Sequence, residues 1–143
     1  MLQQHPWAKL RPLLHPYFVL NDERDKLYER IEKRIDLMLD EGLLDEVKFL
    51  KAKGYTKDMV SMQGLGYKEI LDYLDGVTTL EEAIYILKRD TRHFAKRQLT
   101  WFRRERDVIW IDKQALGYDE EKVIDEMIRN CIERGVLSDD MFR

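Results

Sequence analysis

The chain has 143 residues, of which 44% are hydrophobic and 37% are charged, and its formal net charge is −3. These values are typical of a single small, helix-rich domain or of part of one. A single cysteine and three histidines at unrelated spacings exclude a disulfide framework and a Cys- or His-based metal site, and no apolar run is long enough to cross a membrane.

The first part of the chain predicts an irregular lead-in, a strand and two helices. Residues 1–16 hold all three prolines and lack the apolar segment of a secretory signal, so the cytoplasm is the expected compartment. The apolar run at residues 17–20, YFVL, predicts a buried strand. A helix follows from about residue 22 to Gly42, and a second one covers residues 43–53.

The second part predicts a turn, a long helix, a second strand and a last helix. Thr78 and Thr79 each precede a glutamate by three positions, a capping-box pattern that predicts the start of a helix reaching about residue 104. The run at residues 108–111, VIWI, predicts the second strand, and a helix over about 119–134 ends the fold. Two strands make a poor sheet alone, but runs that are apolar on both faces suit a parallel sheet covered on both sides.

The stretch from residue 88 to residue 106 is basic, whereas the rest of the chain is acidic. It carries eight Lys or Arg and two acids, a local charge of +6, which leaves −9 elsewhere. On a helix, its cations share one arc, and Leu87, Phe94, Trp101 and Phe102 fall on the opposite arc. This segregation favours one face that binds a polyanion and one that packs, with Trp101 and Phe102 anchoring the helix. The alternative is a solvated charged face.

Residues 96–103, KRQLTWFR, resemble the KRQxTWxR signature of tRNA dimethylallyltransferases. Further blocks of that family match residues 22–34, 42–47 and 63–69, so the resemblance covers about residues 17–112 and only the second half of such an enzyme. It implies a mainly α fold with two short strands, the closing half of a P-loop nucleotide-kinase-like α/β fold that is incomplete without its N-terminal half. The expected divisions are a lead-in at 1–16, the C-terminal helical portion at 17–135 and a tail at 136–143.

The resemblance also implies site residues. The expected tRNA contacts are Gly66, Tyr67, Lys68, Arg92, Lys96, Arg97, Thr100 and Arg103. For the turn at residues 64–68, a helix-to-helix connection with glycine caps remains the alternative. Arg34 is a weak candidate for a diphosphate contact, whereas Arg30 favours pairing within its own helix. Gln98 stays ambiguous between burial and RNA.

The implied reaction transfers a dimethylallyl group from dimethylallyl diphosphate to N6 of an adenosine beside the anticodon. The chain lacks the G-x-x-x-x-G-K-[ST] loop, and the family's general base lies in the first half, so no catalytic residue or metal ligand is assigned here and the chain alone is predicted to be inactive. Mg²⁺ is expected, with ligands outside this chain. The expected partners are the tRNA anticodon stem-loop, dimethylallyl diphosphate and the N-terminal P-loop half, with no membrane.

Two alternative functions remain open on the sequence. One is a helical RNA-binding module without catalysis, and the other is a structural fragment whose basic face binds an acidic protein. If a neighbouring half is needed to cover the sheet, the strand residues Phe18, Val19, Ile109 and Trp110 should be partly uncovered in this chain.

Overall fold

The computed structural model describes residues 16–137. The chain divides into two compact units, which are described separately. The helical unit is Arg24–Trp101, and the sheet unit consists of the described residues up to Glu23 and from Phe102 onward. The predicted mainly helical fold with two strands is confirmed. The larger P-loop sheet and the divisions at residues 16 and 135 stay predictions, and residues 1–15 and 138–143 lie outside the described part.

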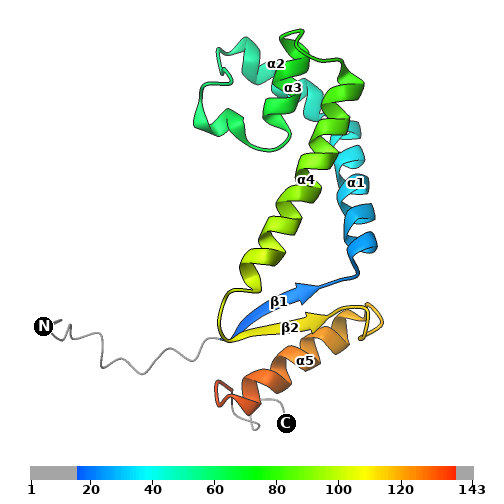
Figure 1. Ribbon diagram of the computed structural model, residues 1–143, viewed down its shortest axis with the longest axis vertical. Helices are drawn as coiled ribbons and strands as arrows, with labels where there is room; N and C mark the ends of the chain where they lie inside the picture. Colours follow the sequence, from blue (N-terminus) through cyan, green and yellow to red (C-terminus); the bar gives the residue numbers. More distant parts are fainter. Residues whose placement is uncertain (1–15, 138–143) are drawn as a thin grey trace, which may run out of the picture. The chain divides into compact units, whose positions relative to one another are not determined.

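The sheet unit is built on two parallel strands (Figure 1). β1 (Tyr17–Asn21) and β2 (Val108–Asp112) pair in register from Tyr17 opposite Val108 to Asn21 opposite Asp112. α5 (Glu120–Glu133) runs beside them. Its N-terminus is capped by Asp119, whose Oδ1 accepts hydrogen bonds from two backbone N–H groups of the first turn, at 3.0 and 3.3 Å.

The strands are only partly covered by the rest of the described chain. Val19 and Ile109 are buried, so the expectation that they would be uncovered is wrong, because neighbouring side chains already remove them from water. The expectation holds for Trp110, which is exposed together with Leu20. These two side chains therefore mark apolar surface of the sheet that the described residues leave open.

A long-range hydrogen bond closes the loop between β2 and α5 onto the end of β1. Tyr118, which has a positive φ of 60°, donates its hydroxyl proton to Oδ1 of Asp22 at 2.8 Å. This hydrogen bond to a carboxylate raises the pKa of Tyr118 to about 12, because the phenol must stay protonated to donate.

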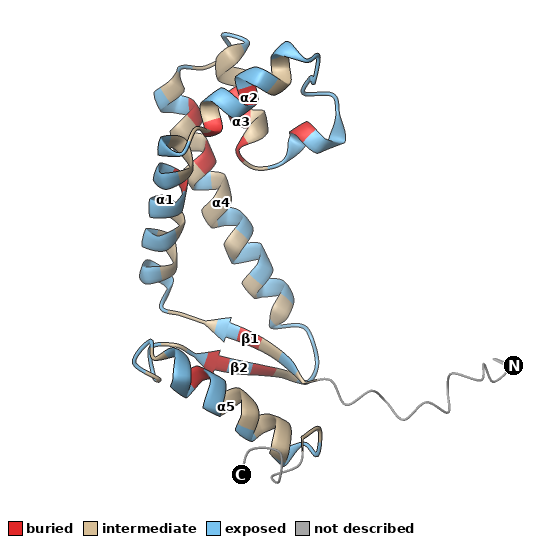
Figure 2. Cartoon of the chain, turned by 180° about the vertical axis from the view of Figure 1, so that it is seen from behind, coloured by how far each residue is buried: buried red, intermediate tan, exposed pale blue. Residues whose placement is uncertain are grey.

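The helical unit contains four α-helices and one short 3-10 helix (Figure 1). They are α1 (Arg24–Asp40), α2 (Leu43–Ala52), η2 (Val60–Gln63), α3 (Tyr67–Leu74) and α4 (Leu80–Phe102, whose last residue belongs to the sheet unit). All five elements contribute buried side chains to one core: Ile35, Leu43, Val47, Met62, Ile70, Leu71 and Leu87. Figure 2 shows these buried segments gathered where α2 and α3 pack on one end of α1 and α4.

Local sequence signals explain how these helices begin. Of the two candidate capping boxes, the one at Thr79 forms: its Oγ1 accepts from the Glu82 N–H at 3.1 Å, and Glu82 accepts from the Thr79 N–H at 3.4 Å. Gly42, between α1 and α2, has a φ of 107°, which a side chain would make unfavourable. Within residues 16–137, no helix is both long enough and apolar enough to span a membrane.

Candidate nucleic-acid interface

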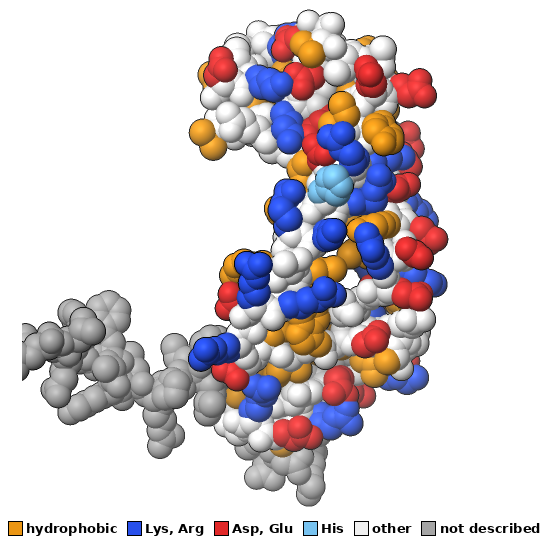
Figure 3. Space-filling view, in the orientation of Figure 1, with side chains coloured by type: hydrophobic (Ala, Val, Ile, Leu, Met, Phe, Trp, Pro, Cys, Tyr) orange, Lys and Arg blue, Asp and Glu red, His pale blue; other side chains and the backbone are white. Residues whose placement is uncertain are grey.

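The outer side of α4 carries exposed cations. His93, Lys96, Arg97 and Thr100 are all exposed, and Figure 3 shows Lys and Arg side chains gathered along this helix. Across the described residues, none of His93, Lys96 and Arg97 forms an ion pair with a carboxylate. The Thr100 hydroxyl donates to the Lys96 carbonyl at 2.9 Å, which leaves its lone pairs available to accept. Arg103 is exposed but follows α4 and belongs to the sheet unit.

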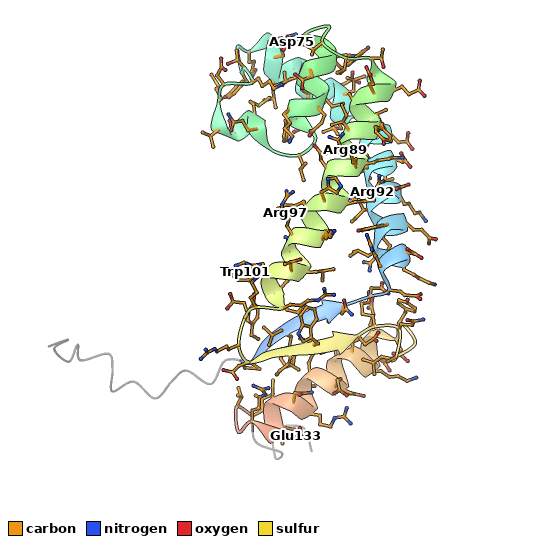
Figure 4. The ribbon with its side chains drawn as sticks, viewed as in Figure 1. Asp75, Arg89, Arg92, Arg97, Trp101 and Glu133 are labelled. Atoms are coloured by element: carbon orange, nitrogen blue, oxygen red, sulfur yellow. The ribbon has the colours of Figure 1, made fainter. Side chains whose placement is uncertain are left out.

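Two other cations of the basic stretch turn toward α1. Lys88 Nζ lies 2.5 Å from Oδ1 of Asp36, and Arg92 pairs with Glu32 through its Nη1 atom. Lys88 and Arg92 are four residues apart on α4, and their partners Asp36 and Glu32 are four apart on α1. The two ion pairs therefore bridge the helices one turn from each other. Figure 4 shows Arg92 on the side of α4 toward α1 and Arg97 on the side away from it. Arg92, predicted to contact tRNA, therefore has a protein carboxylate as its partner.

The polar groups of the glycine turn are engaged inside the protein. The Tyr67 hydroxyl donates to Oε1 of Glu46 on α2 at 2.7 Å, and this hydrogen bond, aided by burial, raises the pKa of Tyr67. Lys68 Nζ lies 3.3 Å from Oε1 of Glu69 and 3.9 Å from Oδ2 of Asp90. Gly66 has a φ of 101°, and its N–H donates to Oε2 of Glu69 at 2.8 Å. These contacts agree with the helix-to-helix alternative for this turn.

Alternating charges connect this turn to α4. Glu69 is only 3% exposed, and its Oε1 has Lys68 as an ionic neighbour but no hydrogen bond of good geometry. Lys68 in turn approaches Asp90, and Asp90 accepts a 2.8 Å hydrogen bond from Nε of Arg89. The Arg89 guanidinium holds the pKa of Asp90 below its usual value. A buried carboxylate is costly unless a positive charge lies beside it, so Lys68 stabilises the buried Glu69 in this fold.

The side chains expected to anchor α4 behave differently from one another. Phe102 is half-buried and packs edge-on against Tyr17 of β1, with ring centroids 6.0 Å apart. Trp101, in contrast, is 53% exposed, so its predicted burial is wrong in this chain. The helical period correctly places Trp101 on the same line along α4 as Leu87, but about half of its side chain is exposed to water. Gln98 is also exposed, which removes it from the buried arc.

An apolar groove of about 650 Å³ lies between α1 and α4 within the helical unit. Apolar side chains of both helices line it, together with three cations of α1, Arg30, Lys33 and Arg34. Arg34, the weak candidate for a diphosphate contact, thus stands beside an apolar surface. Among residues 16–137, no three His, Cys, Asp or Glu side chains come together as a metal site would require. The expected Mg²⁺ stays untested.

Comparisons with known proteins point to one family. A family model described as IPP transferase matches residues 2–105. A tRNA dimethylallyltransferase of Lachnoclostridium phytofermentans is 55% identical over 126 residues, which are 88% of this chain and 40% of that protein. The chain thus spans well under half the length of this curated relative.

Two solved structures are similar as well. The full-length tRNA isopentenylpyrophosphate transferase of Bacillus halodurans has a TM-score of 0.79 and 46% identity, with 88% of this chain and 41% of that chain covered. The tRNA delta(2)-isopentenylpyrophosphate transferase of Staphylococcus epidermidis has a TM-score of 0.76 and 36% identity, with 82% and 38% covered. Identities of this size go beyond a shared fold.

Proposed function

The chain belongs to the IPP transferase family, and from this premise we propose that it is the C-terminal, tRNA-gripping portion of a tRNA dimethylallyltransferase of the cytoplasm. In the intact enzyme, N6 of an adenosine beside the anticodon attacks C1 of dimethylallyl diphosphate, and diphosphate leaves. The chain supplies contacts to RNA and not the reacting groups, which are assigned to the P-loop half. A bound Mg²⁺ would supply charge neutralisation to the diphosphate leaving group, and its ligands are likewise assigned outside this chain.

One observation carries this proposal: Lys96 and Arg97, on the outer side of α4, form no ion pair with a carboxylate of the described chain, unlike Lys88, Arg89 and Arg92. Lys96 and Arg97 are exposed. Arg97 points about half a helical turn away from the bridging residues Lys88 and Arg92, and Lys96 follows Arg92 by one turn without a carboxylate of its own. Unpaired cations along one helix face are available to phosphates, whereas paired ones must first break an ion pair. We therefore rank Lys96, Arg97 and Thr100 above Arg92, Tyr67 and Lys68 as RNA contacts.

Arg34 is proposed to meet the diphosphate, as the family resemblance implied. The support is its place beside the apolar groove between α1 and α4, because a prenyl diphosphate joins an apolar group to an anion. Arginine suits that anion because its planar guanidinium can donate two parallel hydrogen bonds.

The test is a salt titration of affinity for an anticodon stem-loop. Binding that weakens linearly in log–log form as salt rises supports the proposal, because neutralised phosphates release counterions. Two other functions predict other results. An acidic protein partner predicts capture from extract that ribonuclease treatment does not reduce. A non-catalytic module predicts stem-loop binding with no gain in transfer activity when an N-terminal half from a relative is added.

A further inference from the structure

An apolar line along α4 is buried at one end and exposed at the other. Leu87, Phe94 and Trp101 follow one another at intervals of seven residues, which is almost two full turns, so they lie on one line along the helix. Leu87 is 2% exposed in the core, whereas Phe94 is 43% and Trp101 is 53% exposed. Large aromatic rings grouped on a surface mark an interaction site more often than a solvated one.

A guanidinium borders this aromatic surface. The Arg97 Cζ atom lies 5.8 Å from the centroid of the Phe94 ring, in cation–π range. Figure 4 shows Arg97 and Trp101 projecting from the same side of α4, away from α1. Aromatic faces interleaved with cations are the chemistry that binds single-stranded nucleic acid, in which bases stack on rings and cations meet the backbone.

We propose that Phe94 and Trp101 form a stacking platform for unpaired RNA bases, with Arg97 contacting the phosphate backbone between them. The inference rests on the proposed RNA-binding function and adds the part of the RNA that α4 recognises. Seven helical residues span about 10 Å, roughly three times the spacing of stacked bases, so the two rings receive bases that are splayed apart. Such bases occur in a loop and not in a duplex.

The rival occupant is an apolar protein segment that continues the core over the exposed line. A segment of that kind would also cover Arg97 and remove its guanidinium from water, which is costly without a carboxylate partner. RNA provides the anionic partner itself, so the charge beside the rings favours RNA.

The test replaces each aromatic side chain with an aliphatic one, so that the position stays apolar but loses its ring. Phe94→Leu and Trp101→Leu keep an apolar side chain but lose the stacking face, whereas Phe94→Trp and Trp101→Phe keep a ring. All four variants of this chain are titrated with an anticodon stem-loop and with a duplex of equal length, beside thermal melts. We expect the leucine variants to bind the stem-loop roughly 5- to 100-fold more weakly at an unchanged salt slope, and the ring-keeping variants to bind within a few-fold of the parent.

Several results would overturn the platform. Leucine variants that bind as tightly as the parent, with the salt slope retained, would show that cations alone hold the RNA and would leave the proposed function standing. A duplex that binds as tightly as the stem-loop would also remove the need for unpaired bases. No salt-dependent binding of either RNA by the parent chain would overturn the platform and the proposed function together. Arg97→Gln is the matched control, because it should flatten the salt slope while both rings remain.

Discussion

The ammonium of Lys88 lies 2.5 Å from the Asp36 carboxylate, so this side chain of α4 is directed toward α1. Together with the pair between Arg92 and Glu32, this contact shows that the cations of the basic stretch fall into two groups with different roles. One set of cations ties α4 to α1, and the other set faces outward from the helix. A count of charges along the sequence treats both sets alike, although Lys96 and Arg97 are available without breaking an ion pair and Lys88 and Arg92 are not.

Removing the outward cations should affect RNA and leave the fold intact. For Lys96→Ala with Arg97→Ala, we expect a melting temperature close to that of the parent, because both side chains are exposed. The log–log salt slope of stem-loop binding should fall by roughly 0.7–0.9 for each phosphate that the variant no longer neutralises. An unaltered slope in this double variant would mean that this side of α4 is an ordinary solvated surface.

The two partners of the α1–α4 bridge should behave as one unit. Arg92→Ala and Glu32→Gln each break the same ion pair, so both should lower the free energy of unfolding by a similar amount, on the order of 1 kcal/mol or less. Stem-loop affinity, measured in parallel with thermal melts, shows whether Arg92 also contacts RNA or only pairs with Glu32. A loss of affinity in Arg92→Ala that Glu32→Gln does not share would return Arg92 to the set of RNA contacts.

The apolar line along α4 predicts unequal effects on stability. Leu87→Ala should cost about 2–5 kcal/mol, because Leu87 is enclosed in the core. Trp101→Ala should cost well under the ~3–5 kcal/mol typical of a fully buried aromatic side chain, because about half of it already meets water. Denaturant unfolding of both variants gives the comparison, and a larger loss for Trp101→Ala would contradict the exposed position of this ring.

The glycine turn should respond to backbone strain and to one hydrogen bond. Gly66→Ala is expected to cost about 1–2 kcal/mol, because its φ of 101° is unfavourable for a residue with a side chain. Gly64→Ala is the control: its φ of −63° is ordinary, and an added Cβ would meet only Tyr67, at 3.7 Å. Tyr67→Phe should cost about 0.5–1.5 kcal/mol by removing the bond to Glu46. Equal losses at the two glycines would argue against the strained conformation.

Alkaline pH should weaken the bond between Tyr118 and Asp22. The pKa of Tyr118 is raised from about 10 to about 12 in the folded chain, so the contribution of this bond to stability is complete below pH 10 and is lost as the pH rises to about 12. Tyr118→Phe should therefore show a shallower fall in the free energy of unfolding over that interval. Because lysines also titrate there, the measured quantity is the difference between parent and variant across the same pH series.

Turnover offers the most direct test of the division of labour within the enzyme. Incubated with dimethylallyl diphosphate, Mg²⁺ and unmodified tRNA, this chain should yield no modified adenosine, because the diphosphate loop and the general base are assigned to the other half. The modified nucleoside is measured after digestion of the tRNA. Product formed by this chain alone would refute that division between the halves.

Periodicity and capping signals in the sequence predict the helices well, because they are local. The Thr79 capping box is an example, since its two hydrogen bonds join residues three apart. The burial of Leu87 also follows from the helical period. The same period assigns Trp101 to the packed face and is wrong about its burial, because a period identifies a line on a helix and not what covers it.

The contacts of the candidate site are harder to predict, because they join distant parts of the sequence. Arg92 and Glu32 are 60 residues apart, and Tyr67 and Glu46 are 21 apart. From the sequence alone, each of these four side chains would be expected to lie on the surface without a partner in the protein. Only the fold shows that a predicted RNA contact such as Arg92 already has a carboxylate, and that Tyr67 joins two helices.

The pairing of Tyr17 with Val108 has a consequence for the order of folding. These strand residues are 91 positions apart, the difference of their residue numbers, and the whole helical unit lies between them. The entropic cost of closing a loop of that length is large while the intervening chain is disordered, and non-local pairings of this kind form late. The helices, with their i-to-i+4 bonds, need no such closure. The helical unit is therefore expected to gain its structure first and to shorten the chain path that the two strands must close.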